Sequence, residues 1–339
     1  MQRRAIAHTA CLGLVLMVLS NVALAQYQLT NLASNEDGKT RHLDKLLVNA
    51  WGVTYAPGSP FWISDNGSGW STLYDGNGVK QDLQVKIPAA SGSGEGSPTG
   101  IVFNGSQEFL VQGWPSIFMF ATLDGTISGW APQSNLHNAI LAVTNSGSVY
   151  TGLAVTSRPT ENFLFAADNA NNRVDMFDGN FRLVKSFTDT TLPPGFAPFG
   201  IQDIDGLLYV AFASTSGGPG GYIDLFSEEG AFLKHLAQGA PLNQPWGMAP
   251  APKNFGPLSN TLLVSNNLDK TGTINAFNGI TGEFVGTVRD TNGRPIHIDQ
   301  LWGIKFGGGS PANGATNELF FTAGPNNNRA GTFGSIELK

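Results

Sequence analysis

The sequence predicts an all-β fold, a six-bladed β-propeller built from four-stranded antiparallel blades. The first observation is a glycine followed by an apolar residue, which recurs six times at spacings of 48, 52, 48, 47 and 56 residues. The second is a series of short apolar runs, separated by turn residues and without a 3.6-residue helical period. Repeats of this length made of short strands are typical of propeller blades. The six pairs begin at Gly52, Gly100, Gly152, Gly200, Gly247 and Gly303.

The third repeat shows the expected order of strands. Its first strand follows Gly152, and its second strand is the apolar run that ends at Asp168. A third strand ends at Phe177, and the dipeptide Asp178-Gly179 predicts a hairpin turn because it tolerates positive φ. A fourth strand is then expected over residues 182–187.

The second repeat is fitted to the same scheme. Its second strand is expected to end at Gln112, and the run Phe118-Met119-Phe120 is assigned to the third strand. The turn at Asp124-Gly125 would then lead to the fourth strand.

The sixth repeat lacks a fourth strand of its own. Its third strand, residues 333–338, reaches the last residues of the sequence, whereas a strand-like run at residues 27–32 precedes the first repeat. If this N-terminal run completes the last blade, the ring is closed by both ends of the chain and one exposed sheet edge is removed. We therefore expect the two ends of the domain to share one blade.

The first 25 residues have the layout of a secretory signal peptide. Two arginines precede an apolar stretch at residues 11–19, and small residues lead to a cleavage site after Ala25. A transmembrane helix is the alternative, but the apolar stretch is short for crossing a bilayer. We expect cleavage after Ala25, export to the periplasm or the medium, and a single propeller domain over residues 26–339.

Charge and composition narrow the range of partners. The formal net charge is −6, and only 13% of the residues are charged. No basic stripe is present, so binding to a nucleic-acid backbone has no support. We expect a monomer that does not insert into a membrane once the signal peptide is removed.

Candidate ligand-binding residues gather at one mouth of the central channel. Antiparallel pairing brings the starts of the first strands and the ends of the second strands to the same face. Aromatic walls with a few polar groups are typical of ligand sites. The alternatives are packing between blades for the tryptophans and turn stabilisation for the polar residues. The candidates are Trp51, Asp65, Asn66, Asp168, Asn169, Trp246, Asn266 and Trp302.

Three of these candidates also form a hypothetical metal site. Asp65, Asp168 and Asn266 offer the carboxylate and amide oxygens that calcium prefers. No cofactor is otherwise expected, because residues 26–339 contain neither cysteine nor a His-Glu-x-x-His pattern. No catalytic residue can be named, because no Gly-x-Ser-x-Gly motif is present.

At the level of families, residues 150–177 resemble an NHL-type propeller repeat. The whole predicted domain is similar to an uncharacterised exported bacterial β-propeller family, most clearly at residues 49–52, 61–66, 97–105 and 321–326. The resemblance implies a six-bladed propeller and export, and it implies no catalytic residue.

Some members of that family carry a C-terminal PEP-type sorting signal. This chain ends in Ser335-Ile-Glu-Leu-Lys339, without an apolar anchor or a basic tail. Sorting to a cell surface by that route is therefore not expected.

Two functions of different classes follow from these observations. The first is a non-enzymatic binding or scaffold module that recognises a protein, peptide or glycan at the channel mouth. The alternative is a calcium-dependent, lactonase-like hydrolase with an axial metal site, which rests on analogy between folds.

Overall fold

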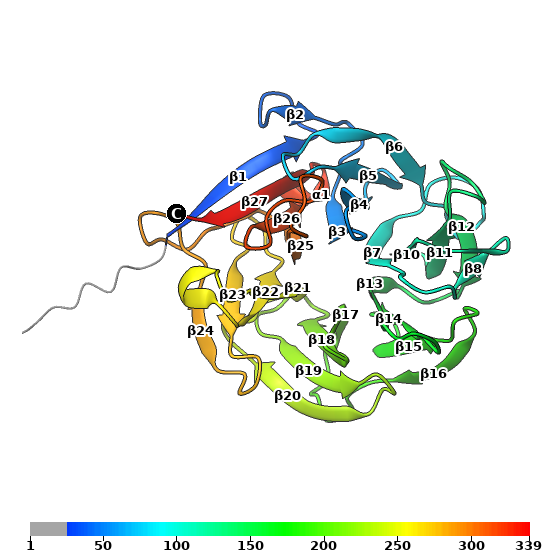
Figure 1. The fold of residues 1–339 in the computed structure, drawn as a ribbon. Coiled ribbons are helices and arrows are strands. Elements are labelled where there is room, and N and C mark those ends of the chain that lie inside the picture. Colours follow the sequence, from blue (N-terminus) through cyan, green and yellow to red (C-terminus); the bar gives the residue numbers. More distant parts are fainter. Residues whose placement is uncertain (1–25) are drawn as a thin grey trace, which may run out of the picture.

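The computed structural model describes residues 26–339, and the predicted signal peptide at residues 1–25 lies outside the described residues. The described chain forms six antiparallel sheets arranged radially around a central axis (Figure 1). This is the predicted six-bladed β-propeller. None of its helices has the length and apolar character needed to cross a membrane.

Four blades consist of four consecutive strands, with the first strand at the axis and the fourth at the rim (Figure 1). Blade 1 contains β3 (Ala50–Thr54), β4 (Phe61–Asp65), β5 (Trp70–Tyr74) and β6 (Lys80–Lys86). Blade 3 contains β13 (Tyr150–Val155), β14 (Leu164–Asp168), β15 (Arg173–Phe177) and β16 (Leu183–Phe187). Blade 4 contains β17 (Phe196–Ile204), β18 (Leu207–Ser214), β19 (Tyr222–Ser227) and β20 (Phe232–Gln238). Blade 5 contains β21 (Pro245–Pro250), β22 (Leu262–Asn266), β23 (Ile274–Phe277) and β24 (Phe284–Thr287).

Blade 2 differs from the prediction by one strand. Its sheet has the order β12-β11-β10-β7, and β10 pairs with both β7 and β11. The run Phe118-Met119-Phe120 lies in β10, so its assignment to the third strand was wrong. Gln112 lies instead between two short strands that form a separate hairpin. The strands are β7 (Pro98–Phe103), β8 (Leu110–Val111), β9 (Trp114–Pro115), β10 (Phe118–Thr122), β11 (Thr126–Trp130) and β12 (Ile140–Thr144).

Blade 6 is closed by the N-terminal strand, as predicted. The outer strand β1 pairs antiparallel with β27, from Tyr27 opposite Leu338 to Ser34 opposite Thr332. The two-residue strand β2 adds to β1 in parallel at the rim. The strands are β1 (Tyr27–Ser34), β2 (His42–Leu43), β25 (Leu301–Phe306), β26 (Leu319–Ala323) and β27 (Thr332–Leu338). Two short helical turns, η1 (Gly256–Leu258) and α1 (Pro325–Asn328), lie in connections.

The repeated glycines have a common physical cause. A Cβ atom built on Gly52 would lie 2.5 Å from the Thr99 backbone oxygen of blade 2. On Gly247 it would lie 2.6 Å from the backbone oxygen of Trp302, and on Gly303 it would lie 2.7 Å from that of Trp51. The inner strands of successive blades therefore approach too closely for any side chain at these positions.

Candidate functional site

The predicted channel mouth is filled by its tryptophans. Trp51, Trp246 and Trp302 form one apolar cluster in which their residues are only 6%, 8% and 3% exposed. The rings of Trp51 and Trp302 are stacked with centroids 3.6 Å apart, and Trp246 meets Trp51 edge-on at 6.1 Å. Leu123 and Phe199 pack against the cluster. We call these five side chains the tryptophan plug, and they leave little indole surface for a ligand.

Hydrogen bonds fix the tryptophan plug across the channel. The Trp246 indole N–H donates to the backbone oxygen of Thr151 at 2.9 Å. The Trp302 indole N–H donates to Oδ1 of Asn49 at 3.2 Å. The Trp51 nitrogen is buried without a partner among the described residues. The arrangement fits packing inside the ring better than contact with a ligand.

The asparagines at this mouth join neighbouring blades. The side chain of Asn66 in blade 1 donates to the backbone oxygen of Pro98 in blade 2 at 3.1 Å. Asn169 in blade 3 makes the equivalent bond to Pro198 of blade 4 at 3.0 Å. Each amide thus satisfies a backbone group at the start of the next inner strand.

The three hypothetical calcium ligands lie in alternate blades, and each has partners close to its own strand. Asp65 accepts a hydrogen bond from Thr72 at 2.7 Å, and Asp168 accepts one from Ser148 at 2.8 Å. Asn266 bonds backbone groups of the preceding connection. Burial raises the pKa of Asp65 well above its ordinary value, which favours its neutral form. Each of the three side chains is thus engaged by groups near its own strand, and the calcium site stays a prediction.

The opposite mouth of the channel is open. It holds a cavity of about 300 Å³ at the ends of the inner strands of blades 1, 4, 5 and 6. A cavity of this size accommodates one small group of a ligand rather than a whole large molecule. We call this cavity the open mouth. Its lining includes Tyr55, Gln202, Asp203, Met248, Lys305 and Phe306.

Lys305 is the cation of the open mouth. Its ammonium nitrogen lies 5.4 Å from the centroid of the Tyr55 ring, a cation–π arrangement. Within residues 26–339 it forms no ion pair. Burial lowers the pKa of Lys305 from its ordinary value. The charge is therefore partly desolvated, and no acidic group of the described residues lies within ion-pair distance, although Asp203 and Asp205 line the same cavity.

Asp203 lies in the same cavity. Burial, followed by the neighbouring Glu228 carboxyl, raises the pKa of Asp203 to about 7. The positive charge of Arg158, which forms an ion pair with Glu228, opposes this rise. Asp203 is thus divided between its neutral and charged forms near neutral pH.

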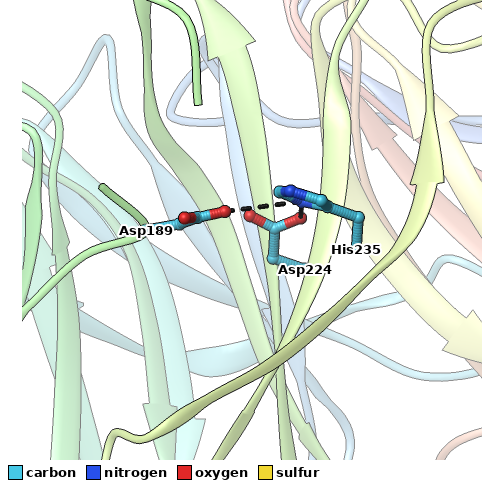
Figure 2. A group of neighbouring side chains, drawn as sticks. All are labelled: Asp189, Asp224 and His235. Carbon is cyan, nitrogen blue, oxygen red and sulfur yellow. Dashed lines mark hydrogen bonds and ion pairs between the residues drawn. The ribbon is translucent and has the colours of Figure 1, made fainter. Parts of the chain in front are cut away.

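A further polar cluster lies at the outer part of blade 4. Asp189, Asp224 and His235 approach one another there (Figure 2). It is the one group of three histidine or acidic side chains with metal-ligand spacing in residues 26–339. The sequence interpretation missed it because Asp189 comes from the connection before the blade. The sequence did contain one signal of the cluster, because Asp224 and His235 occupy opposite positions in the neighbouring strands β19 and β20.

No protein-family profile matches the chain. Uncharacterized protein R648 of Acanthamoeba polyphaga mimivirus is 30% identical, with 93% of this chain and 81% of the relative covered. Uncharacterized protein L690 of the same virus is also 30% identical, with 93% of this chain and 86% of the relative covered. The predicted resemblance to exported bacterial proteins remains a prediction, because these relatives are viral.

Solved structures are similar in fold alone. A gluconolactonase of Xanthomonas campestris is 14% identical, with a TM-score of 0.55 and 86% of each chain covered. A virginiamycin B lyase of Staphylococcus aureus is 14% identical, with a TM-score of 0.53 and 93% and 100% of the two chains covered. Because the sequence identity to uncharacterized protein R648 of Acanthamoeba polyphaga mimivirus is 30% and extends over most of both chains, the chain belongs to the family that includes this viral protein.

Proposed function

We propose that the protein is an exported, non-enzymatic binding or scaffold module that recognises a protein, peptide or glycan at a channel mouth. The single observation that carries this proposal is the contrast between the two mouths. The tryptophan plug fills one mouth, whereas the open mouth offers a cavity of about 300 Å³. We therefore assign the ligand to the open mouth rather than to the tryptophan-bearing face.

The lining of the open mouth suggests the chemistry of the ligand. Tyr55, Met248 and Phe306 supply apolar and aromatic surface. Lys305 supplies a cation that forms no ion pair with the described residues, which favours a carboxylate or another oxygen-rich group. A peptide with an acidic group beside an apolar side chain has this character, and so does a glycan that contains an acidic sugar.

The alternative, a calcium-dependent hydrolase with an axial metal, has less support. Its three ligands, Asp65, Asp168 and Asn266, lie in alternate blades, and each has a hydrogen-bond partner near its own strand. Only Oδ1 of Asp65 is buried without a partner among their described side-chain atoms. The likeness to a gluconolactonase is a likeness of fold, and one fold hosts many functions.

Export is proposed from the sequence of residues 1–25. Mass spectrometry of the protein recovered from culture medium or periplasm would test it. An N-terminus at Gln26 is expected, and a cell-retained protein that begins at Met1 would contradict it.

The binding proposal is tested with peptide and glycan arrays and the variant Lys305→Met, which keeps an unbranched side chain of similar length and removes the charge. We expect at least a tenfold loss of affinity for acidic ligands, because a charge-assisted hydrogen bond is worth roughly 1.5–3 kcal/mol. The matched control is Lys270→Met, the same change at an exposed residue of the β22–β23 connection at the other mouth.

Equal losses in Lys305→Met and Lys270→Met would overturn the assignment to the open mouth. Calcium-dependent cleavage of ester or lactone substrates by the wild type, abolished in Asp168→Ala, would replace the binding module with the hydrolase.

A further inference from the structure

We propose that Asp189, Asp224 and His235 form a binding site for a divalent transition-metal ion, with zinc as its representative. Asp189 lies in the connection between β16 and β17, Asp224 in β19 and His235 in β20. One ligand atom from each residue lies within 4.8 Å of the other two. The site belongs to the outer part of blade 4 and is separate from both channel mouths.

The distances are close to those of a metal coordination sphere. Nδ1 of His235 is 2.7 Å from Oδ1 of Asp224 and 3.4 Å from Oδ2 of Asp189. With bonds of about 2.0–2.1 Å, the ligand atoms of a tetrahedral zinc ion are about 3.3 Å apart. The three side chains point toward one another, as Figure 2 shows. A metal therefore requires only a small adjustment of the side chains.

Two carboxylate oxygens at the site are buried and accept no hydrogen bond. The side chains of Asp189 and Asp224 are 1% and 0% exposed. Oδ2 of each has no hydrogen-bond partner among the described residues. Buried carboxylates are stable when they are paired, hydrogen-bonded or bound to a metal. These oxygens thus have unused capacity to coordinate a cation.

Thr191 holds two of the proposed ligands in place. Its backbone N–H and its hydroxyl both lie 2.7 Å from Oδ1 of Asp189. The same hydroxyl oxygen is 3.1 Å from Nε2 of His235. If the hydroxyl donates to Asp189, it accepts from Nε2–H, and the lone pair of Nδ1 then faces Asp224. Metal-binding histidines are commonly oriented by such a bond from the second ring nitrogen.

Comparison with blade 3 shows which feature is special to blade 4. In blade 3, Asp175 lies opposite Ser186 and accepts its hydroxyl hydrogen bond at 2.6 Å. The amide of Asn145, from the preceding connection, donates to the same carboxylate at 3.3 Å. The cross-strand polar pair is thus a repeated feature of the fold. In blade 4 the serine is replaced by His235, and the neutral amide donor is replaced by the carboxylate of Asp189.

This replacement creates a need for a cation or for a proton shared by the two carboxylates. Two carboxylates in one buried space repel each other unless a positive charge or a shared proton lies between them. A protonated His235 is the simplest cation: its Nδ1–H donates to Oδ1 of Asp224, and the same nitrogen lies 3.4 Å from Oδ2 of Asp189, within ion-pair distance. Oδ2 of Asp224 is still left without a partner among the described residues. A metal ion would satisfy one oxygen from each carboxylate together with the imidazole. One imidazole with two carboxylates suits zinc better than calcium, which prefers oxygen ligands alone.

The His235 side chain is 33% exposed, so the ion can enter from solvent and complete its coordination with water. Bound there, it would tie the connection between blades 3 and 4 to the outer strands of blade 4.

The test is calorimetric titration of untagged, chelator-treated protein with zinc chloride, followed by cobalt substitution and visible absorption spectroscopy. We expect one zinc ion per chain and the d–d bands of a bound cobalt ion. Asp189→Asn should lose at least tenfold in zinc affinity, because it replaces a charged ligand by a neutral amide like that of Asn145. His235→Gln should behave in the same way, and the exposed His137→Gln is the control.

Metal-free stability provides a second readout. We expect Asp189→Asn to fold normally by circular dichroism and to melt at the wild-type temperature or above without zinc, since one carboxylate repulsion is removed. A lower melting temperature of this variant without metal would favour a histidine–carboxylate ion pair and overturn the proposal. Absence of one-to-one zinc binding, or equal affinity in the wild type and both site variants, would overturn it as well.

Discussion

At the scale of single residues, the protonation state of Asp203 in the open mouth changes with pH near neutrality. Its pKa is raised from the ordinary value of 3.8 to about 7, first by burial and then by Glu228. The folded protein therefore binds a proton more tightly at this site than the unfolded chain does. The stability that this proton contributes is fully present below pH 4 and is lost as the pH rises through about 7.

The first prediction follows from this sign. Asp203→Asn keeps a neutral side chain at every pH, so we expect the variant to be more stable than the wild type at pH 8. At pH 4 the difference should be small. Urea unfolding at the two pH values measures it, with Asp82→Asn as the control because Asp82 is exposed in β6. A wild type that gains stability relative to Asp203→Asn between pH 4 and pH 8 would contradict the prediction.

The tryptophans show what residue types alone leave undecided. Trp51, Trp246 and Trp302 were predicted at a channel mouth, and they lie at one mouth. Whether they line a site or fill it depends on the width of the channel, which is set by how closely the inner strands approach. A tryptophan beside glycine is compatible with both outcomes.

At the scale of elements, β1 is the strand on which closure of the ring depends. Tyr27 is buried in the core between blades 5 and 6, and its hydroxyl donates to the backbone oxygen of Phe255 at 2.8 Å. The antiparallel ladder with β27 covers nearly the whole of β1. Loss of this strand would expose the edge of β27.

We expect Tyr27→Ala to lower the free energy of unfolding by about 3–5 kcal/mol, the range for removing a large buried aromatic side chain. The control Val184→Ala, on the exposed outer strand of blade 3, should change it by less than about 0.5 kcal/mol. Chemical denaturation checks both values. Deletion of residues 27–35 should destabilise the whole ring, and unchanged melting of that truncated protein would show that closure does not depend on β1.

Strand assignment failed where the chain contains an insertion. The turn at Asp124-Gly125 was correctly predicted, but it joins β10 to β11 rather than a third strand to a fourth. The β8–β9 hairpin precedes β10 and occupies the place where the second strand was expected. The residues of a turn show that the chain turns there, but they do not show which two strands of the blade the turn joins.

At the scale of the whole molecule, the sequence predicted the number of blades and the closure, because the glycine period reflects contacts that every blade makes. The open mouth could not be predicted. The residues that line it come from blades 1, 4, 5 and 6. They lie at or just beyond the ends of the inner strands, where no repeated sequence pattern marks them. The metal-site candidate was missed for a related reason, because it depends on one substitution in one blade.

Calcium separates the proposed function from its alternative. We expect excess calcium to leave the melting temperature of the wild type unchanged after chelation. A native-state ligand at a hundredfold excess over its dissociation constant would add about 2.7 kcal/mol. Differential scanning calorimetry decides this. A rise that is lost in Asp168→Ala but kept in Asp189→Asn would indicate the axial calcium site of the hydrolase.

The closure of blade 6 also sets how the domain responds to force. Tyr27 and Leu338 are opposite each other at one end of the β1–β27 ladder, so the chain enters and leaves the domain at the same point. Tension applied through these two positions would act across the ladder and break its hydrogen bonds one pair at a time. The propeller would therefore open under a weak pull at its ends, whereas a tether through either end alone would leave the ring unloaded.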